Sequence, residues 1–209
     1  MTCLLRTRGS VSEMVRLFAA EPDPGLVWPE SIWPGDRVPV VIEEDGMRRL
    51  TTMAWGLPVE TFVKPVPASQ RGIIYPRDLW RDGSRLRDGR SLPRCLILLE
   101  SFAYPMGTKG QCTRGWIGLW DHPVAAWAGV FEGGGCAGML VMANERVEPL
   151  SSTMPHLLPS QDQTCWLERG SLLLLGPGYA DAEYYRENLG ERWSSGRPDE
   201  ELPLFRAAS

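Results

Sequence analysis

The sequence lacks several features that would assign a function directly. No apolar run approaches the ~18–20 residues that span a bilayer, and the N-terminus lacks the long apolar core of a signal peptide. The five cysteines are an odd number and form no CxxC or Cys/His metal pattern. Internal repeats are also missing. We therefore expect a reduced, cytoplasmic protein with free thiols, no membrane contact, no metal and no other cofactor.

A positive overall charge is missing too, although the charges are unevenly distributed. The net charge of −4 does not indicate a general nucleic-acid binder. Between Arg71 and Arg94, however, seven arginines stand against three aspartates, whereas Asp181 to Glu201 carries seven acidic residues against three arginines. The basic stretch is either a local phosphate-binding loop or a solvated loop of alternating sign.

Glycine and proline are plentiful, and they indicate a chain with many turns. The 22 Gly and 18 Pro favour a strand-rich fold. A helix is expected over 10–20, where Ser10 and Glu13 form a capping box, and a second one from Ser160, with Gln163 at the same capping position. Strand-like runs occupy 38–45, 48–57, 95–99, 115–120, 125–131 and 137–143, and short apolar runs occupy 72–75 and 172–175. Asp45-Gly46 predicts a hairpin turn.

These elements predict one α+β, strand-dominated domain over residues 1–209, most simply a curved or barrel-like mixed sheet with a few short helices. The polar tail from Glu187 is expected to fray. The segment 94–105, RCLILLESFAYP, predicts a buried strand that runs into a tight turn, where folds often place a working side chain.

The ordered set of motifs resembles the SRAP family (SOS response-associated peptidases) over residues 3 to about 175. The matching pieces, in chain order, are Cys3, Leu17-Phe18, Pro39 to Val41, Trp55 to Pro58, Arg77, Arg94 to Leu96, AWAGVFEG, LVMANERVEPL, Met154-Pro155 and Trp166-Leu167. The resemblance implies a role related to abasic sites in single-stranded DNA, which members of the family protect by covalent attachment.

The resemblance also implies an active site, and this chain departs from it. The family uses an N-terminal Cys, an Asn, a Glu and a His. Tyr75 stands at the Asn position, Tyr104 at the Glu position and Ser151 at the His position. Losing one general acid or base typically costs ~10²–10⁴ in rate, so the replacements predict lost or much reduced chemistry.

Cys3 is the remaining catalytic candidate, and it is displaced by one position. Removal of Met1 leaves Thr2 at the N-terminus, so the thiol lacks an α-amine on its own residue and cannot close the thiazolidine ring. Cleavage after Thr2 would restore that amine. The alternative is that Cys3, followed by two leucines, is a small buried hydrophobe.

Other side chains suggest what a degenerate site would retain. Arg77, Trp55 and Pro39 are expected to contact DNA through phosphates, stacking or an apolar wedge. His156 is expected to be a structural or outward-facing residue, and His122 a surface one.

Three readings stay open. The first is a degenerate SRAP-like protein that at most binds single-stranded DNA. The second is an active abasic-site crosslinker or cysteine peptidase that uses Cys3 after N-terminal processing. The third is a non-catalytic protein-binding module with the Pro/Trp-rich segment 22–35 as its interface; that segment could instead wrap the core with Trp28 and Trp33. The protein partner, if any, is not indicated.

Overall fold

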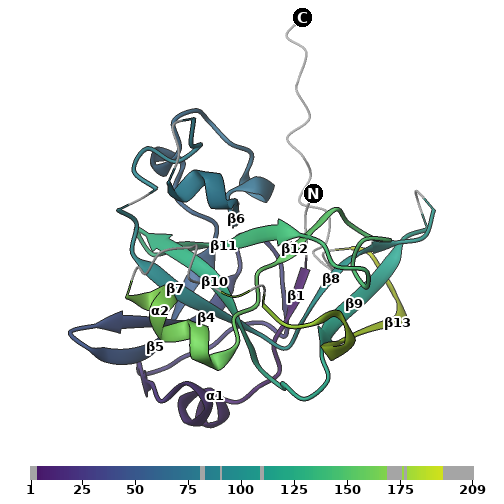
Figure 1. Cartoon of the computed structure of the whole chain (residues 1–209), viewed down its shortest axis with the longest axis horizontal. Coiled ribbons are helices and arrows are strands. Elements are labelled where there is room, and N and C mark those ends of the chain that lie inside the picture. Colours follow the sequence, from purple (N-terminus) through teal and green to yellow (C-terminus); the bar gives the residue numbers. More distant parts are fainter. Residues whose placement is uncertain are drawn as a thin grey trace, which may run out of the picture.

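Two sheets and two α-helices make up the described part of the chain (Figure 1). The computed structural model describes residues 4–80, 83–89, 91–108, 111–168, 176 and 178–194. One sheet is antiparallel and the other mixes antiparallel with parallel pairs. The prediction of a strand-dominated α+β fold is confirmed.

The larger sheet has the strand order β12-β11-β10-β7-β4-β5-β2, and a further short strand, β6, pairs with β11. Its strands are β2 (Glu21–Pro22), β4 (Arg37–Glu44), β5 (Met47–Trp55), β6 (Ile73–Ile74), β7 (Arg94–Leu99), β10 (Ala125–Glu132), β11 (Gly135–Met142) and β12 (Thr153–Pro155). The β4–β5 hairpin turns at Asp45 and Gly46, both with positive φ (52° and 76°), as a tight hairpin turn requires. β11 also pairs in parallel with β5.

The smaller sheet has the order β13-β9-β8-β1-β3. Its strands are β1 (Leu4–Arg6), β3 (Ser31–Ile32), β8 (Ser101–Met106), β9 (Thr113–Leu119) and β13 (Tyr184–Arg192). The chain passes from the larger sheet into the smaller one at Glu100, between β7 and β8. The carboxylate of Glu100 forms ion pairs with Arg6 and Arg8 at this crossing.

The structure of segment 94–105 differs from the expectation of a tight turn after the buried strand. Its first half is a fully buried strand, as predicted, but Tyr104 lies within strand β8 and not in a tight turn. The physical reason is the neighbouring strands: β1 and β9 pair with β8 on its two sides and hold it extended. Leu4 is paired with Ala103, the residue before Tyr104.

Helix α1 (Val11–Phe18) begins after Ser10, whose hydroxyl accepts a hydrogen bond from the Glu13 N–H at 3.2 Å. Its buried side chains are Met14 and Phe18. Helix α2 (Ser160–Leu167) packs on the larger sheet, since the Trp166 indole donates to carbonyl oxygens of both β7 and β10. Both predicted helices are confirmed, although Ser160 is the first helical residue and does not cap α2.

The tail expectation is wrong over residues 187–192, which belong to β13 and pair with β9. Ion pairs hold this polar strand at the sheet edge: Glu187 binds Arg6 at 2.9 Å and Glu191 binds Arg114 at 3.0 Å. The alternation of exposed polar residues was mistaken for an unstructured tail. The apolar run 172–175 lies outside the described residues.

The Pro/Trp-rich segment 22–35 lies partly against the core. The Trp28 indole donates to the Thr7 carbonyl at 3.3 Å, and the Trp33 ring packs edge-on against Trp193 at 5.3 Å between centroids. Both tryptophans are half-buried, whereas Val27, just before Trp28, is exposed. In the part of the chain described above, no helix is long and apolar enough to cross a membrane.

Candidate functional site

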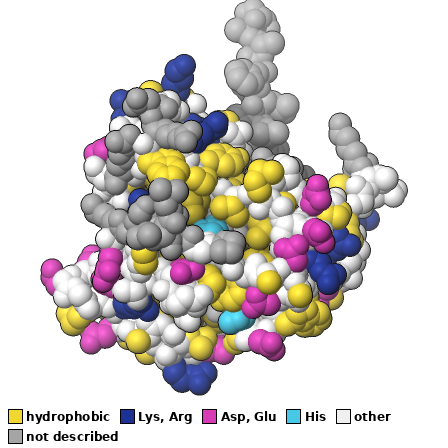
Figure 2. All heavy atoms as spheres, viewed as in Figure 1, with side chains coloured by type: hydrophobic (Ala, Val, Ile, Leu, Met, Phe, Trp, Pro, Cys, Tyr) yellow, Lys and Arg dark blue, Asp and Glu magenta, His cyan; other side chains and the backbone are white. Residues whose placement is uncertain are grey.

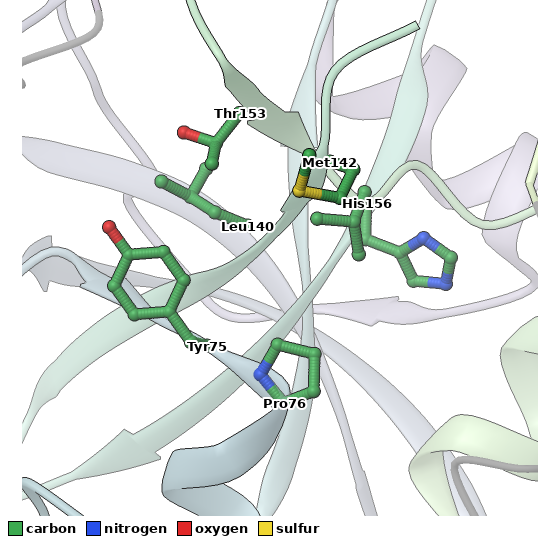
Figure 3. Close-up of a pocket in the computed structure, with 7 residues that line it drawn as sticks. Tyr75, Pro76, Leu140, Met142, Thr153 and His156 are labelled. Atoms are coloured by element: carbon green, nitrogen blue, oxygen red, sulfur yellow. The ribbon is translucent and has the colours of Figure 1, made fainter.

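A pocket of about 490 Å³ opens where strand β6 ends beside strand β11. β6 stops at Ile74, opposite Met139, because the chain turns into a 3₁₀ turn (Pro76–Leu79) in which Pro76 has no N–H to donate. β11 runs on to Met142 and is paired there with β12. The pocket is lined by Tyr75, Pro76, Leu140, Val141, Met142, Thr153 and His156 (Figure 3).

Hydrophobic side chains gather on the face that β11 and β12 present (Figure 2). Leu140 is buried at the pocket wall, whereas Met142 is 79% exposed. Tyr75 and Thr153 are half-buried, and Figure 3 shows their hydroxyl groups on the same side of the pocket. The site is thus an apolar pocket with hydroxyls at one side, a type of surface suited to a flat organic ring.

Two arginines lie close to the ring of Tyr75. The guanidinium of Arg85 lies 5.1 Å from the ring centroid and that of Arg77 lies 5.6 Å from it, both within cation–π range. They differ in electrostatic state. Arg85 pairs with the buried carboxylate of Asp78 at 2.9 Å, whereas Arg77 is exposed and forms no ion pair among the described residues.

Asp78 organises this part of the site. Its carboxylate accepts hydrogen bonds from the backbone N–H groups of Tyr75 (2.9 Å) and Arg85 (3.1 Å) and from the Arg85 side chain. Burial pushes the Asp78 pKa upward, but the hydrogen bonds from Arg85 and from the backbone outweigh it, so the pKa lies below its ordinary value. The charge of Arg85 is therefore used inside the fold, and Arg77 is the cation left for a ligand.

The basic stretch 71–94 is largely committed to the protein itself. Arg87 donates to the Glu60 carbonyl, Arg71 donates to the Leu57 carbonyl, and Arg94 is buried with its guanidinium 4.6 Å from the Trp166 ring centroid. Arg81 and Arg90 lie outside the described residues. The reading of this stretch as a freely solvated loop is corrected: most of its described arginines bind carbonyls, rings or Asp78.

A second cluster lies next to the pocket around the Thr153 carbonyl. The Tyr104 hydroxyl donates to this oxygen at 2.9 Å and the Ser151 hydroxyl donates to it at 2.7 Å. Ser151 also accepts from the Thr153 N–H at 3.2 Å. Tyr104 and Ser151 are both buried. Thr153 connects this cluster to the pocket, because its side chain lines the pocket that Tyr75 also lines. Tyr75, Tyr104 and Ser151, the three positions predicted from the sequence, therefore all lie at the pocket or next to it.

His156 lines the pocket with its imidazole. It is 7% exposed. Its pKa is lowered by burial, and the nearby Asp162 carboxylate opposes that shift. The expectation of a structural residue agrees with its burial, although the sequence did not indicate that it would line the site. The pocket residues Leu140, Met142 and Thr153 were not predicted, because aliphatic strand residues carry no signal that separates a pocket wall from a core.

The proposed DNA contacts of Trp55 and Pro39 are not supported by their burial. Trp55 has no exposed surface and its indole donates to the Gly72 carbonyl at 2.8 Å. Pro39 is buried in β4, opposite Thr52. Neither side chain presents a face for stacking, so both are corrected to core residues. Cys3 lies outside the described residues.

The described residues contain no group of three or more His, Cys, Asp or Glu that could hold a metal ion. The donors around the pocket are hydroxyls, one imidazole and arginines. The arrangement can bind a ligand through ring contacts, hydrogen bonds and one positive charge. Its described residues offer neither a carboxylate nor a thiol at the pocket wall.

No protein-family model matches the chain, and a search of curated proteins finds no match either. Solved structures do match. A protein from Bordetella bronchiseptica is 15% identical with a TM-score of 0.69, over 90% of this chain and 99% of that one. A protein from Bacteroides thetaiotaomicron is 12% identical with a TM-score of 0.67, over 88% and 90%.

A phage-related protein from Bordetella bronchiseptica is 13% identical with a TM-score of 0.63, over 90% of this chain and 94% of that one. These likenesses extend over most of every chain, so the fold as a whole is shared. At such low identity they show the fold alone, and the chain has the same fold as these bacterial proteins.

Proposed function

We propose that this chain is a divergent SRAP-like protein that has lost the covalent chemistry of that family and at most binds single-stranded DNA. The observation that carries the proposal is the Tyr104–Thr153–Ser151 cluster. At the positions of the family's Glu and His, this chain has two hydroxyls that both donate to one carbonyl oxygen. A tyrosine hydroxyl with an ordinary pKa of ~10 is a poor proton shuttle at neutral pH.

Several further features support the family assignment. The parallel pairing of β11 with β5 joins the two ends of the run β5-β4-β7-β10-β11, which fits the barrel-like sheet that the resemblance implies. Tyr75, Tyr104 and Ser151, far apart in the chain, lie at one pocket or next to it. A family active site would bring its residues together in the same way.

Arg77 supports a remaining affinity for DNA. It is exposed, free of ion pairs among the described residues and located beside the pocket. A single arginine gives a weak, salt-sensitive contact with a phosphate. We expect single-stranded DNA to bind at low salt and to be released as the salt concentration rises.

The chemistry is tested with a single-stranded oligonucleotide that carries one abasic site. Two proteins are compared: the chain as it stands, and a variant without Thr2, in which removal of Met1 exposes Cys3 as the N-terminal residue. We expect no covalent adduct from either protein on a denaturing gel or by intact-mass measurement. An adduct that forms and disappears with Cys3→Ser would establish that the chemistry persists and would overturn the proposal.

The DNA affinity is tested separately with an intact oligonucleotide at low salt. Arg77→Ala is expected to weaken binding, whereas Arg16→Ala, which removes an equal charge from the exposed face of α1, is expected to leave it unchanged. Equal effects of the two substitutions, or no binding by the unmodified chain, would remove the nucleic-acid part of the proposal.

A further inference from the structure

The pocket beside Tyr75 has the wrong chemistry for an abasic sugar and a suitable one for an intact base. Its walls are mostly carbon, from Tyr75, Pro76, Leu140, Val141 and Met142. A deoxyribose without a base offers polar oxygens and no flat surface, so it would leave these walls in contact with water. Covering apolar surface favours binding in proportion to the area removed from water.

We propose that this pocket binds an intact nucleobase, with the phosphate of the same nucleotide at Arg77. The inference rests on the proposed DNA binding and deepens it, because it names what the altered site recognises. The volume of about 490 Å³ is in the range of pockets that hold small organic ligands. Such a pocket accommodates one planar ring system.

The wall residues provide the contacts that a base uses. Tyr75 and Pro76 present rings, and the Met142 thioether is a polarisable group that makes favourable contacts with aromatic rings. Stacking of one base on an aromatic side chain contributes roughly five- to hundredfold in affinity. The hydroxyls of Tyr75 and Thr153 lie on the same side of the pocket (Figure 3), where they can donate to or accept from a base edge.

The charge beside the pocket fits the other end of a nucleotide. The Arg77 guanidinium lies 5.6 Å from the centroid of the Tyr75 ring and is exposed. Because Asp78 already neutralises Arg85, Arg77 is, among the described arginines near the Tyr75 ring, the one without an ion pair, and it can meet one phosphate. An arginine binds a phosphate with two parallel N–H donors, which fixes its orientation as well as its position.

A free nucleotide and a nucleotide within a single strand both offer a planar base and a phosphate, so the experiment includes ligands of both kinds. Three ligands are titrated: thymidine monophosphate, the trinucleotide TTT, and the same trinucleotide with a stable abasic analogue in the middle. The readout is the methyl resonance of Met142 in protein labelled with ¹³C-methyl methionine. Met142 lines the pocket, so an inserted base shifts this signal by its ring current.

Met47, which is 61% exposed at the β4–β5 hairpin, provides the matched control. Its methyl signal is expected to stay in place. Met142→Glu changes an exposed side chain, so the fold is retained, and it is expected to weaken binding of TTT by roughly fivefold or more. Met47→Glu adds the same charge elsewhere and is expected to have no such effect.

The inference predicts that TTT shifts the Met142 signal and binds roughly fivefold or more tightly than the abasic trinucleotide. A similar shift with thymidine monophosphate identifies the pocket as a nucleotide site, and a shift with TTT alone identifies a base read within a strand; both support the inference. If TTT and its abasic analogue bind equally and Met142 does not move, the inference is wrong while the proposed DNA binding stands.

If none of the three ligands binds at low salt, the proposed DNA binding fails together with the inference. A tripeptide with a central phenylalanine and a free carboxylate tests whether the pocket binds a peptide instead. If it shifts the Met142 signal and the nucleotides do not, the pocket is a peptide site and the nucleobase assignment is overturned.

Discussion

Tyr104 and Ser151 are two residues, far apart in the chain, whose hydroxyl groups share one hydrogen-bond acceptor. Both hydroxyls donate to the Thr153 carbonyl, at 2.9 Å and 2.7 Å. Both side chains are buried; the Tyr104 hydrogen bond links strand β8 to β12, and the Ser151 hydrogen bond closes the turn before β12. The resemblance to the SRAP family predicted that these two residues stand where the family has its Glu and His, but the sequence did not indicate that they share one acceptor.

This shared acceptor leads to a prediction about stability. Tyr104→Phe and Ser151→Ala are each expected to lower the free energy of unfolding by about 1 kcal/mol, because the carbonyl keeps one of its two side-chain donors. The double variant is expected to lose more than the sum of the two, since the carbonyl of the half-buried Thr153 is then deprived of both side-chain donors. Urea denaturation of the four proteins measures this coupling; strictly additive effects would show that the two hydrogen bonds are independent.

Residue identity alone gave a wrong result at Trp55 and Pro39. Both belong to motifs of the SRAP resemblance and were assigned to DNA, yet both are core residues. A motif records which residues recur and not which face of a strand they occupy. The face depends on strand register, and here it follows from pairing with residues that are distant in the chain, such as Pro39 with Thr52.

At the scale of elements, local sequence patterns correctly predicted the elements whose conformation depends on residues next to each other in the chain. The β4–β5 hairpin and helix α1 follow from Asp45-Gly46 and from the Ser10 cap, and both are confirmed. The sequence was insufficient where a distant partner determines the element. β13 is a polar strand that pairs with β9, and β6 is two residues long and pairs with β11. Neither has a local signal strong enough to identify it.

Two glycines, Gly138 in β11 and Gly118 in β9, let aromatic side chains approach the sheets, and they provide a matched test. A Cβ at Gly138 would collide with the ring of Trp127, which is fully buried and donates to the Met139 carbonyl. A Cβ at Gly118 would meet Tyr185, which is half-buried at the sheet edge and can move.

We therefore expect Gly138→Ala to destabilise the protein by about 1–3 kcal/mol, the usual cost of overpacking a core. Gly118→Ala is expected to be nearly neutral, since displacing Tyr185 is offset by the lower conformational entropy of alanine in the unfolded chain. Thermal and urea denaturation compare the two variants. A loss at Gly118 as large as that at Gly138 would show that Tyr185 is held as firmly as the core tryptophan.

At the scale of the whole molecule, the net charge of −4 and the internal pairing of most described arginines in the stretch 71–94 both argue against strong binding to nucleic acid. The many arginines of the stretch 71–94 suggested more free positive charge than the described residues have. A sequence does not reveal which guanidinium groups bind carbonyls or carboxylates. The structure leaves Arg77 beside one apolar pocket. In the proposed binding mode, ring contacts in this pocket therefore add to the single phosphate contact of Arg77.

The pH dependence of global stability gives a last prediction, carried by His156 and Asp78. Burial lowers the pKa of His156 in the folded protein, so the native state resists a proton that the unfolded chain accepts near its ordinary pKa of about 6.5. Stability is therefore expected to fall as the pH drops below that value, by at most about 1.4 kcal/mol per pH unit for one group. The pKa of Asp78 is also lowered in the folded protein, because burial, which raises it, is outweighed by the hydrogen bonds from Arg85 and the backbone. The stabilising contribution of Asp78 is therefore complete above about pH 4 and is lost as the pH falls through its folded-state pKa.

Urea denaturation between pH 8 and pH 5 isolates the histidine, because Asp78 stays ionised throughout that range. His156→Gln is expected to flatten the decline in the free energy of unfolding between these values. His122→Gln, which changes the half-buried histidine before Pro123, serves as the matched control and is expected to keep it. A decline that survives His156→Gln and disappears with His122→Gln would show that the titrating group is not the imidazole in the pocket, and that protonation there does not oppose folding.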